Sequence, residues 1–239
     1  MASPLGHVQP TGLLQDRLLA LAGTPDHSFR IGTDLTVVAQ LAAKLINVVD
    51  CSSVTSRHAG SYATVAASDE LAVVVDQAQY EDKAGPCLEA LEAHYPAAVP
   101  DIAATVTWPG FRDTAARFGL TTSLSIPLFT GSGTTIAALN LYSRRAGALS
   151  TLTTAVWAAY DPDTADHWDH DALDAGAREL TAGLISAVAV RTMIQRAIAV
   201  LSADGTGPGH GYLILCDRAA ETGASLTETA AQVIEQHQP

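Results

Sequence analysis

The sequence predicts an α+β domain, with a mostly antiparallel sheet flanked by helices, followed by an all-α segment that begins with a long, coiled-coil-like helix. Strand-like runs occur as adjacent pairs, each joined by a short turn, near both ends of the first 150 residues. These pairs are 51–58 with 62–69 and 123–129 with 134–143. Apolar residues that repeat every seven positions over 173–201 indicate the long helix.

The remaining elements of the first domain follow from helical periodicity and from turn residues. A short amphipathic helix is predicted in residues 1–33, and Thr33 or Asp34 is expected to cap a helix that continues to Ile46. Further helices are predicted over 70–81 and 86–94 and from Pro109 to Phe118, with an extended segment, AAVPDI, before the last of them. The predicted order is therefore α-β-β-α-α-β-α-β-β.

The charge balance argues against a protein that binds polyanions through a basic surface. The 239 residues contain 13 Lys and Arg against 25 Asp and Glu, a formal net charge of −12. No segment resembles a signal peptide, and the apolar stretch Leu184–Val190 is far shorter than the ~20 residues of a membrane-spanning helix. The three Cys form no metal-binding or disulfide pattern. We therefore expect a cytoplasmic protein that does not associate with membranes.

Six Asp and no basic residue lie between 151 and 174, and we assign 151–168 to the first domain as an acidic insert. Its segment DPDTADHWDHD, 161–171, could hold a cation through carboxylates. The spacing does not match an EF-hand, and a solvated loop that leads into a helix N-terminus explains the same residues. We predict that the chain has neither a metal site nor a cofactor.

No set of residues forms a recognisable catalytic constellation, so we predict that the protein is not an enzyme. Cys87 lies in the first turn of a predicted helix, where a thiol could be activated, but a buried core residue is the favoured interpretation. The large aromatic residues Trp108, Phe111 and Tyr142 could line a ligand pocket together with Cys87, or could pack in the core.

The long predicted helix, from Asp171 to Ser202, carries an apolar heptad seam that is interrupted by Arg191. Gly176 and Gly183 each cost a helix ~1 kcal/mol relative to Ala, so packing against other helices or a dimer must support it. We predict a homodimer through 173–201. Two shorter helices follow, at Tyr212–Thr222 and after Ser225, where Ser225 and Glu228 have capping-box spacing.

Several motifs occur in order over about sixty residues of the first domain. They are GPC-x-x-A at 85–90, Val99 with Asp101, WP-x-F at 108–111, Ala116 with Gly119, Ser123, Pro127-Leu128 and ALNLYS at 138–143. This pattern resembles the GAF domain of actinobacterial GAF-ANTAR regulators. The tail resembles the ANTAR module, a three-helix RNA-binding domain, at Arg191, Ile194, Ala197, Leu201, Leu215, Ala219, Leu226 and Ala230.

The resemblance implies three parts: an N-terminal segment at 1–33, a GAF-like sensor at 34–168, and the long helix with an ANTAR-like domain at 169–237. It also implies a signal-responsive transcription antitermination regulator that senses a ligand or protein partner and binds dual RNA stem-loops as a dimer. The expected RNA-binding residues are Arg191, Thr192, Gln195, Arg196 and Arg218.

An alternative stays open, in which a degenerate member acts as a dimeric small-molecule or protein-interaction sensor without binding RNA. Residues 175–239 contain four Arg against six acidic residues, a net charge of −2. Ile198-Ala199 also stands where ANTAR modules usually have Lys-Gly, and the acidic and neutral residues 221–224 replace the usual basic ones. The sequence specifies neither the ligand nor the target RNA.

Overall fold

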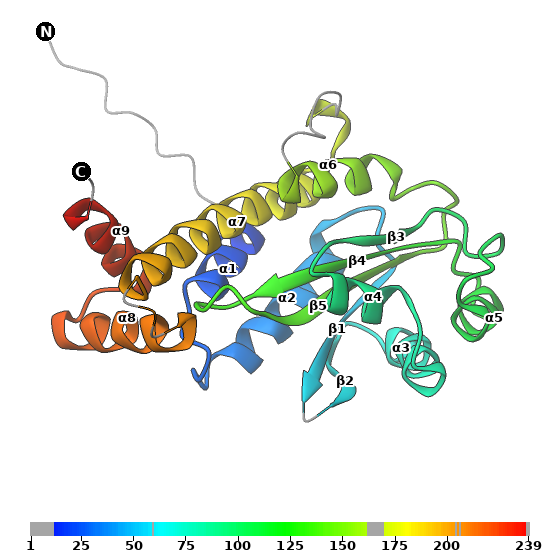
Figure 1. Ribbon diagram of the computed structural model, residues 1–239. Coiled ribbons are helices and arrows are strands. Elements are labelled where there is room, and N and C mark those ends of the chain that lie inside the picture. Colours follow the sequence, from blue (N-terminus) through cyan, green and yellow to red (C-terminus); the bar gives the residue numbers. More distant parts are fainter. Residues whose placement is uncertain (1–11, 59, 162–169, 204, 206, 238–239) are drawn as a thin grey trace, which may run out of the picture.

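The computed structural model describes residues 12–237 except 59, 162–169, 204 and 206. Five strands form a single antiparallel sheet in the order β2-β1-β5-β4-β3, and helices cover both of its faces (Figure 1). The predicted α+β fold and order of elements are thereby confirmed for the first domain. The elements are α1 (Leu13–Ala22), α2 (Ile31–Leu45), β1 (Cys51–His58), β2 (Ser61–Ala67), α3 (Glu70–Asp82), α4 (Pro86–Ala93), β3 (Ala97–Val99), α5 (Pro109–Arg117), β4 (Thr122–Phe129), β5 (Thr135–Ser143), α6 (Ser150–Tyr160), α7 (Ala175–Leu201), α8 (Pro208–Thr222) and α9 (Leu226–Gln236).

The two faces of the sheet have different chemistry because side chains alternate along each strand. One face carries mainly apolar side chains and packs against α1, α2, α6 and α7, and its buried Ser52 donates a hydrogen bond to the Ala39 carbonyl oxygen of α2 at 2.6 Å. Its buried residues include Val54, Leu124, Ile126, Leu128, Ala137, Leu139 and Leu141. The opposite face is covered by α3 and α4, with α5 packed beside α3. This second face positions the candidate site.

Helix α2 begins earlier than the sequence predicts. Its first residue is Ile31, and its N-cap is Arg30, so neither Thr33 nor Asp34 caps it. Asp34 is instead buried in the first turn, where its carboxylate accepts a hydrogen bond of 3.2 Å from Arg17 of α1. The capping rule failed because a contact with another helix fixes the Asp34 side chain.

The segment 151–168 is not a uniform acidic insert. Helix α6 occupies 150–160, and Leu152, Ala155 and Val156 are buried in the core on the apolar face of the sheet. All six Asp lie after residue 160, so averaging the composition over the whole segment concealed a core helix. Most of 161–171, the segment with the candidate cation ligands, lies outside the described residues.

Helix α7 begins at Ala175, after Asp174 rather than at Asp171, and the Asp174 carboxylate accepts a hydrogen bond of 2.8 Å from the Ala177 N–H. The heptad seam is filled by helices of the same chain: by α1 in its first half and by α8 and α9 in its second. The seam is therefore intramolecular, contrary to its interpretation as a coiled-coil surface. The homodimer itself stays a prediction.

The two glycines of α7 permit these close helix contacts. A Cβ atom at Gly176 would overlap the Leu45 carbonyl group of α2, and one at Gly183 would press on Leu18 of α1. The propensity cost of glycine is thus offset by packing. By length and composition α7 could cross a membrane, but core helices pass the same test, and 11 of its 27 residues are buried.

The C-terminal half of α7 forms a three-helix unit with α8 and α9 around a shared apolar cluster that includes Ile194, Leu215 and Val233. Helix α8 begins at Pro208, four residues before its predicted start, with Gly207 as its N-cap. The capping box of α9 is confirmed, because Ser225 and Glu228 exchange both expected hydrogen bonds. Figure 1 shows this unit at one end of the molecule, beyond the β4–β5 turn.

Candidate ligand-binding site

Polar side chains form two rows on the face of the sheet that α3 and α4 cover. Residues directly opposite in an antiparallel pair point to the same face. One row therefore comprises Ser53, Asn140 and Ser125, and the next comprises Cys51, Tyr142 and Ser123. Helix α3 places Asp76 and Gln79 against them. We call the buried polar side chains Ser53, Thr55, Asp76, Gln79, Ser123, Ser125, Asn140 and Tyr142 the polar layer.

Asp76 is the centre of the hydrogen bonds in the polar layer. Its Oδ1 accepts from the Tyr142 hydroxyl at 2.6 Å and from Asn140 Nδ2 at 3.3 Å, and its Oδ2 accepts from Thr64 at 2.9 Å. Gln79 extends the network, since its Nε2 donates to Tyr142 at 3.2 Å and its Oε1 accepts from the Cys87 N–H at 3.0 Å. The network ties α3 and the start of α4 to the central strand β5.

Three atoms of this layer remain unpartnered among the described residues: Ser123 Oγ, Ser125 Oγ and Asn140 Oδ1. All three side chains are buried. A buried polar group without a hydrogen bond costs ~1–3 kcal/mol. Buried polar atoms are nearly always satisfied in proteins, so three that lie in adjacent positions of two paired strands require an explanation.

Burial raises the pKa of the Asp76 carboxyl group to about 6, even though hydrogen bonds from Ser53, Tyr142, Thr64 and Asn140 act in the opposite direction. Desolvation is the largest cause, because the low-dielectric surroundings disfavour the charged form. Near neutral pH the ionised carboxylate is therefore held in the interior at a cost. It could accept a hydrogen bond or an ion pair from a ligand that carries donors.

The cysteines near this layer are not poised as nucleophiles. Cys87 is fully buried, and desolvation raises the pKa of its thiol well above the usual value. The same cause raises the pKa of Cys51 to about 12. Because the thiolate is the reactive form, both thiols are held in their unreactive state.

Three of the four predicted pocket residues share one hydrophobic cluster, and their role in a ligand pocket stays a prediction. Tyr142 and Phe111 are buried in one cluster, against which Trp108 packs, and Cys87 lies beside the polar layer, where its N–H donates to Gln79. Trp108 is half-buried and borders two surface hollows of about 450 and 400 Å³. Sequence analysis missed Asp76, Asn140, Ser123 and Ser125. For the serines the signal was present, since in SLSIPLF they alternate with apolar residues.

Some of the predicted RNA-binding residues contact the first domain, and the others lie on the surface of the tail. Arg191 donates from Nε to the Gly133 carbonyl oxygen at 2.9 Å, and its guanidinium lies 4.4 Å from the centre of the Phe129 ring. Burial lowers the pKa of Arg191 below its usual value. Gln195 lies over Gly133, Thr192 and Arg196 are exposed, and Arg218 is half-buried on α8.

Comparisons with known proteins match the first domain. The model of the GAF domain family matches residues 33–161, which is more than half of the chain. One solved structure that resembles the chain is a type II free methionine-R-sulfoxide reductase from Thermoplasma acidophilum, 13% identical, with a TM-score of 0.40. The match covers 62% of this chain and 92% of that one. The search of curated proteins finds no match.

Proposed function

This chain belongs to the GAF domain family, and we propose that its polar layer senses a small polar ligand and thereby controls an RNA-binding tail. The observation that carries the ligand-sensing proposal is the set of three unpartnered buried atoms in the polar layer. A ligand that supplied their hydrogen bonds would remove a cost that the folded chain otherwise bears.

The polar layer favours a ligand that is rich in hydrogen-bond donors. Asp76 and Asn140 Oδ1 accept hydrogen bonds, whereas the hydroxyls of Ser123 and Ser125 can either donate or accept. An amine, amide or polyol fits this set better than an anion, because the Asp76 carboxylate would repel negative charge. The two hollows beside Trp108 suggest an entry route between α4 and the segment before α5.

The strands that carry the unpartnered atoms also lead to the tail. The turn between β4 and β5 presents the Gly133 carbonyl oxygen to Arg191, and Phe129 at the end of β4 packs under the same guanidinium. A ligand that displaces β4 or β5 would therefore change the two contacts that hold the Arg191 guanidinium. We propose that this contact is the relay from the sensor to the tail.

RNA binding by the tail rests on the resemblance to ANTAR modules. Arg196 and Arg218 make no ion pair among the described residues, and Arg196 is exposed while Arg218 is half-buried, so we propose both for phosphate contacts. Arg191 becomes available only when the β4–β5 turn releases it. In this proposal the ligand increases RNA affinity by freeing a third cation, since each phosphate contact releases bound counterions.

A sensor without RNA binding is a second candidate, and the intramolecular contact of Arg191 favours it. That contact removes one of the few cations from a tail whose net charge is −2. Its output would be a change in protein association through the tail. We propose that neither form is an enzyme, since both buried thiols are held protonated.

One experiment in two stages tests the proposal. A thermal-shift screen of amino acids, polyols and nucleobases against the full chain identifies compounds that raise the Tm. The Ser125→Ala variant, which lacks one unpartnered hydroxyl, should lose most of that shift. A filter-binding assay with a pool of dual stem-loop RNAs then measures RNA binding by the tail. It is run at two salt concentrations, with and without the compound.

We expect salt-dependent RNA retention that the compound increases and that the double variant Arg196→Ala with Arg218→Ala reduces at least tenfold. Arg117→Ala, which removes an exposed arginine from α5, is the matched control and should bind as the wild type does. A compound that binds without any salt-dependent RNA retention would favour the sensor without RNA binding. No stabilising compound, or equal shifts in Ser125→Ala, would contradict ligand sensing by the polar layer.

A further inference from the structure

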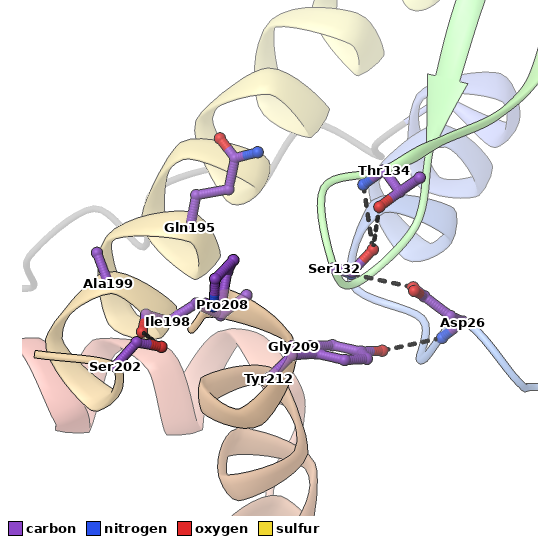
Figure 2. Close-up of a pocket in the computed structure, with 10 residues that line it drawn as sticks. All are labelled: Asp26, Ser132, Thr134, Gln195, Ile198, Ala199, Ser202, Pro208, Gly209 and Tyr212. Carbon is purple, nitrogen blue, oxygen red and sulfur yellow. Dashed lines mark hydrogen bonds between the residues drawn. The ribbon is translucent and has the colours of Figure 1, made fainter. Parts of the chain in front are cut away.

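A separate cavity lies between the sensor domain and the tail. Neither α3 nor α4, the helices that cover the polar layer, lines it. Its volume of about 690 Å³ lies within the ~300–1,000 Å³ range of small-molecule sites. Four segments form its walls: the loop between α1 and α2, the β4–β5 turn, the C-terminal half of α7 and the first turns of α8 (Figure 2). An occupant would therefore touch both the sensor and the tail.

The walls contributed by the tail are mostly apolar. Ile198 and Ala199 come from α7, and Pro208 with the ring of Tyr212 comes from α8. Figure 2 shows Tyr212 extending from α8 toward Asp26, below the β4–β5 turn. Apolar walls with an aromatic ring suit a flat, ring-shaped molecule, because such a ligand buries much area with few rotatable bonds.

The opposite wall holds a fixed carboxylate. Asp26 Oδ1 accepts hydrogen bonds from the Thr130 hydroxyl at 2.9 Å and from the Ser132 N–H at 3.0 Å, while the Asp26 N–H donates to the Tyr212 hydroxyl at 3.0 Å. Since both bonds to the carboxylate end on Oδ1, Oδ2 accepts none from the described residues. The Asp26 side chain is thus held in place, and its Oδ2 atom can still accept hydrogen bonds.

A second polar group faces the β4–β5 turn from α7. The Gln195 side chain lies over Gly133, where a Cβ atom would press on its amide nitrogen, and Figure 2 shows it pointing toward the turn. Its amide makes no hydrogen bond with the part of the chain that the structure describes. It can therefore offer both a donor and an acceptor to an occupant.

From these features we propose that this cavity binds a flat nitrogen heterocycle with an amino group. The amino N–H groups would donate to Asp26 Oδ2, the ring would lie against Ile198, Pro208 and Tyr212, and the Gln195 amide would pair with an edge of the ring. Anionic ligands are excluded by the carboxylate of Asp26. This site is distinct from the polar layer and does not depend on RNA binding by the tail.

Calorimetric titration of the full chain with 2-aminobenzimidazole, 2-aminopyridine and adenine tests the proposal, with quinoline as a flat control that has no N–H donor. At least one amino heterocycle should bind, and quinoline should bind at least tenfold more weakly. Asp26→Asn, which keeps the acceptor for Thr130 and Ser132 but removes the charge, should weaken binding at least tenfold, since hydrogen bonds to charged groups are the stronger ones.

Ala199→Phe should block the cavity from its α7 wall, and Ala189→Phe, at an exposed position of the same helix outside the cavity, is the matched control. Binding should be lost in the first variant and kept in the second, with an unchanged Tm in both. The proposal is overturned if no amino heterocycle binds at millimolar concentration or if Asp26→Asn and Ala199→Phe bind as the wild type does. Loss of binding in Ser125→Ala alone would also overturn it, by placing the ligand in the polar layer.

Discussion

The two faces of the central sheet are built from the same strands but differ in chemistry. On one face Leu124, Ile126, Leu139 and Leu141 pack against four helices. On the other, the residues that alternate with them in the sequence are Ser123, Ser125, Asn140 and Tyr142, and three of their polar atoms have no partner among the described residues. We infer that the apolar face supplies stability, whereas the polar layer gives up stability for recognition.

Truncation on the apolar face is expected to have the largest effect. Leu139→Ala would leave a cavity at the centre of the sheet, where the side chain is fully buried, and should lower the free energy of unfolding by about 2–5 kcal/mol. Urea denaturation measures the change. The control Leu213→Ala, at a residue that is 59% exposed on α8, should change it by less than about 0.5 kcal/mol. Comparable losses in both would break the assignment of stability to the apolar face.

Removing the buried charge of the polar layer should have a pH-dependent effect of the opposite sign. The pKa of Asp76 is raised from 3.8 to about 6, so the folded state binds the proton more tightly than the unfolded state does. This contribution to stability is present below about pH 4 and is lost as the pH rises through 6, a decline of about 3 kcal/mol.

Asp76→Asn keeps an acceptor for Tyr142 and Asn140, and its amide can donate to the Thr64 hydroxyl. The variant should lack the decline between pH 4 and 6 and should exceed the wild type in stability at pH 7. Denaturation curves of both proteins are measured across this pH range. The difference between their free energies of unfolding removes the contribution of the other titrating groups. A variant that is less stable than the wild type at pH 7 would show that the Asp76 charge stabilises the fold.

Much of the fold was predictable because periodicity and turns are local properties. The strand pairs and helices α3, α4 and α5 follow from alternation, helical spacing and the placement of Pro86 and Pro109. The predictions that failed depend on distant partners. Asp34 pairs with Arg17 instead of capping a helix, and the heptad seam of α7 is covered by other helices of the same chain.

The candidate site was hidden for the same reason. Alternation in β4 shows that Ser123 and Ser125 share a face, but alternation is equally typical of a solvent-exposed face. Their burial depends on α3 and α4, which precede them by some thirty to fifty residues. The contact of Arg191 with the first domain was also hidden, because its partner is a backbone carbonyl group in the β4–β5 turn.

The central claim is tested most directly by two matched serine substitutions in one row of the polar layer. Ser53 and Ser125 are both fully buried and flank Asn140, but Ser53 accepts a hydrogen bond of 3.1 Å from Asn140 whereas Ser125 Oγ has no partner among the described residues. Urea denaturation should show that Ser125→Ala raises the free energy of unfolding by about 1 kcal/mol and that Ser53→Ala lowers it by a similar amount. If both substitutions lower it, the Ser125 hydroxyl stabilises the fold, and the account of the polar layer as a recognition surface is contradicted.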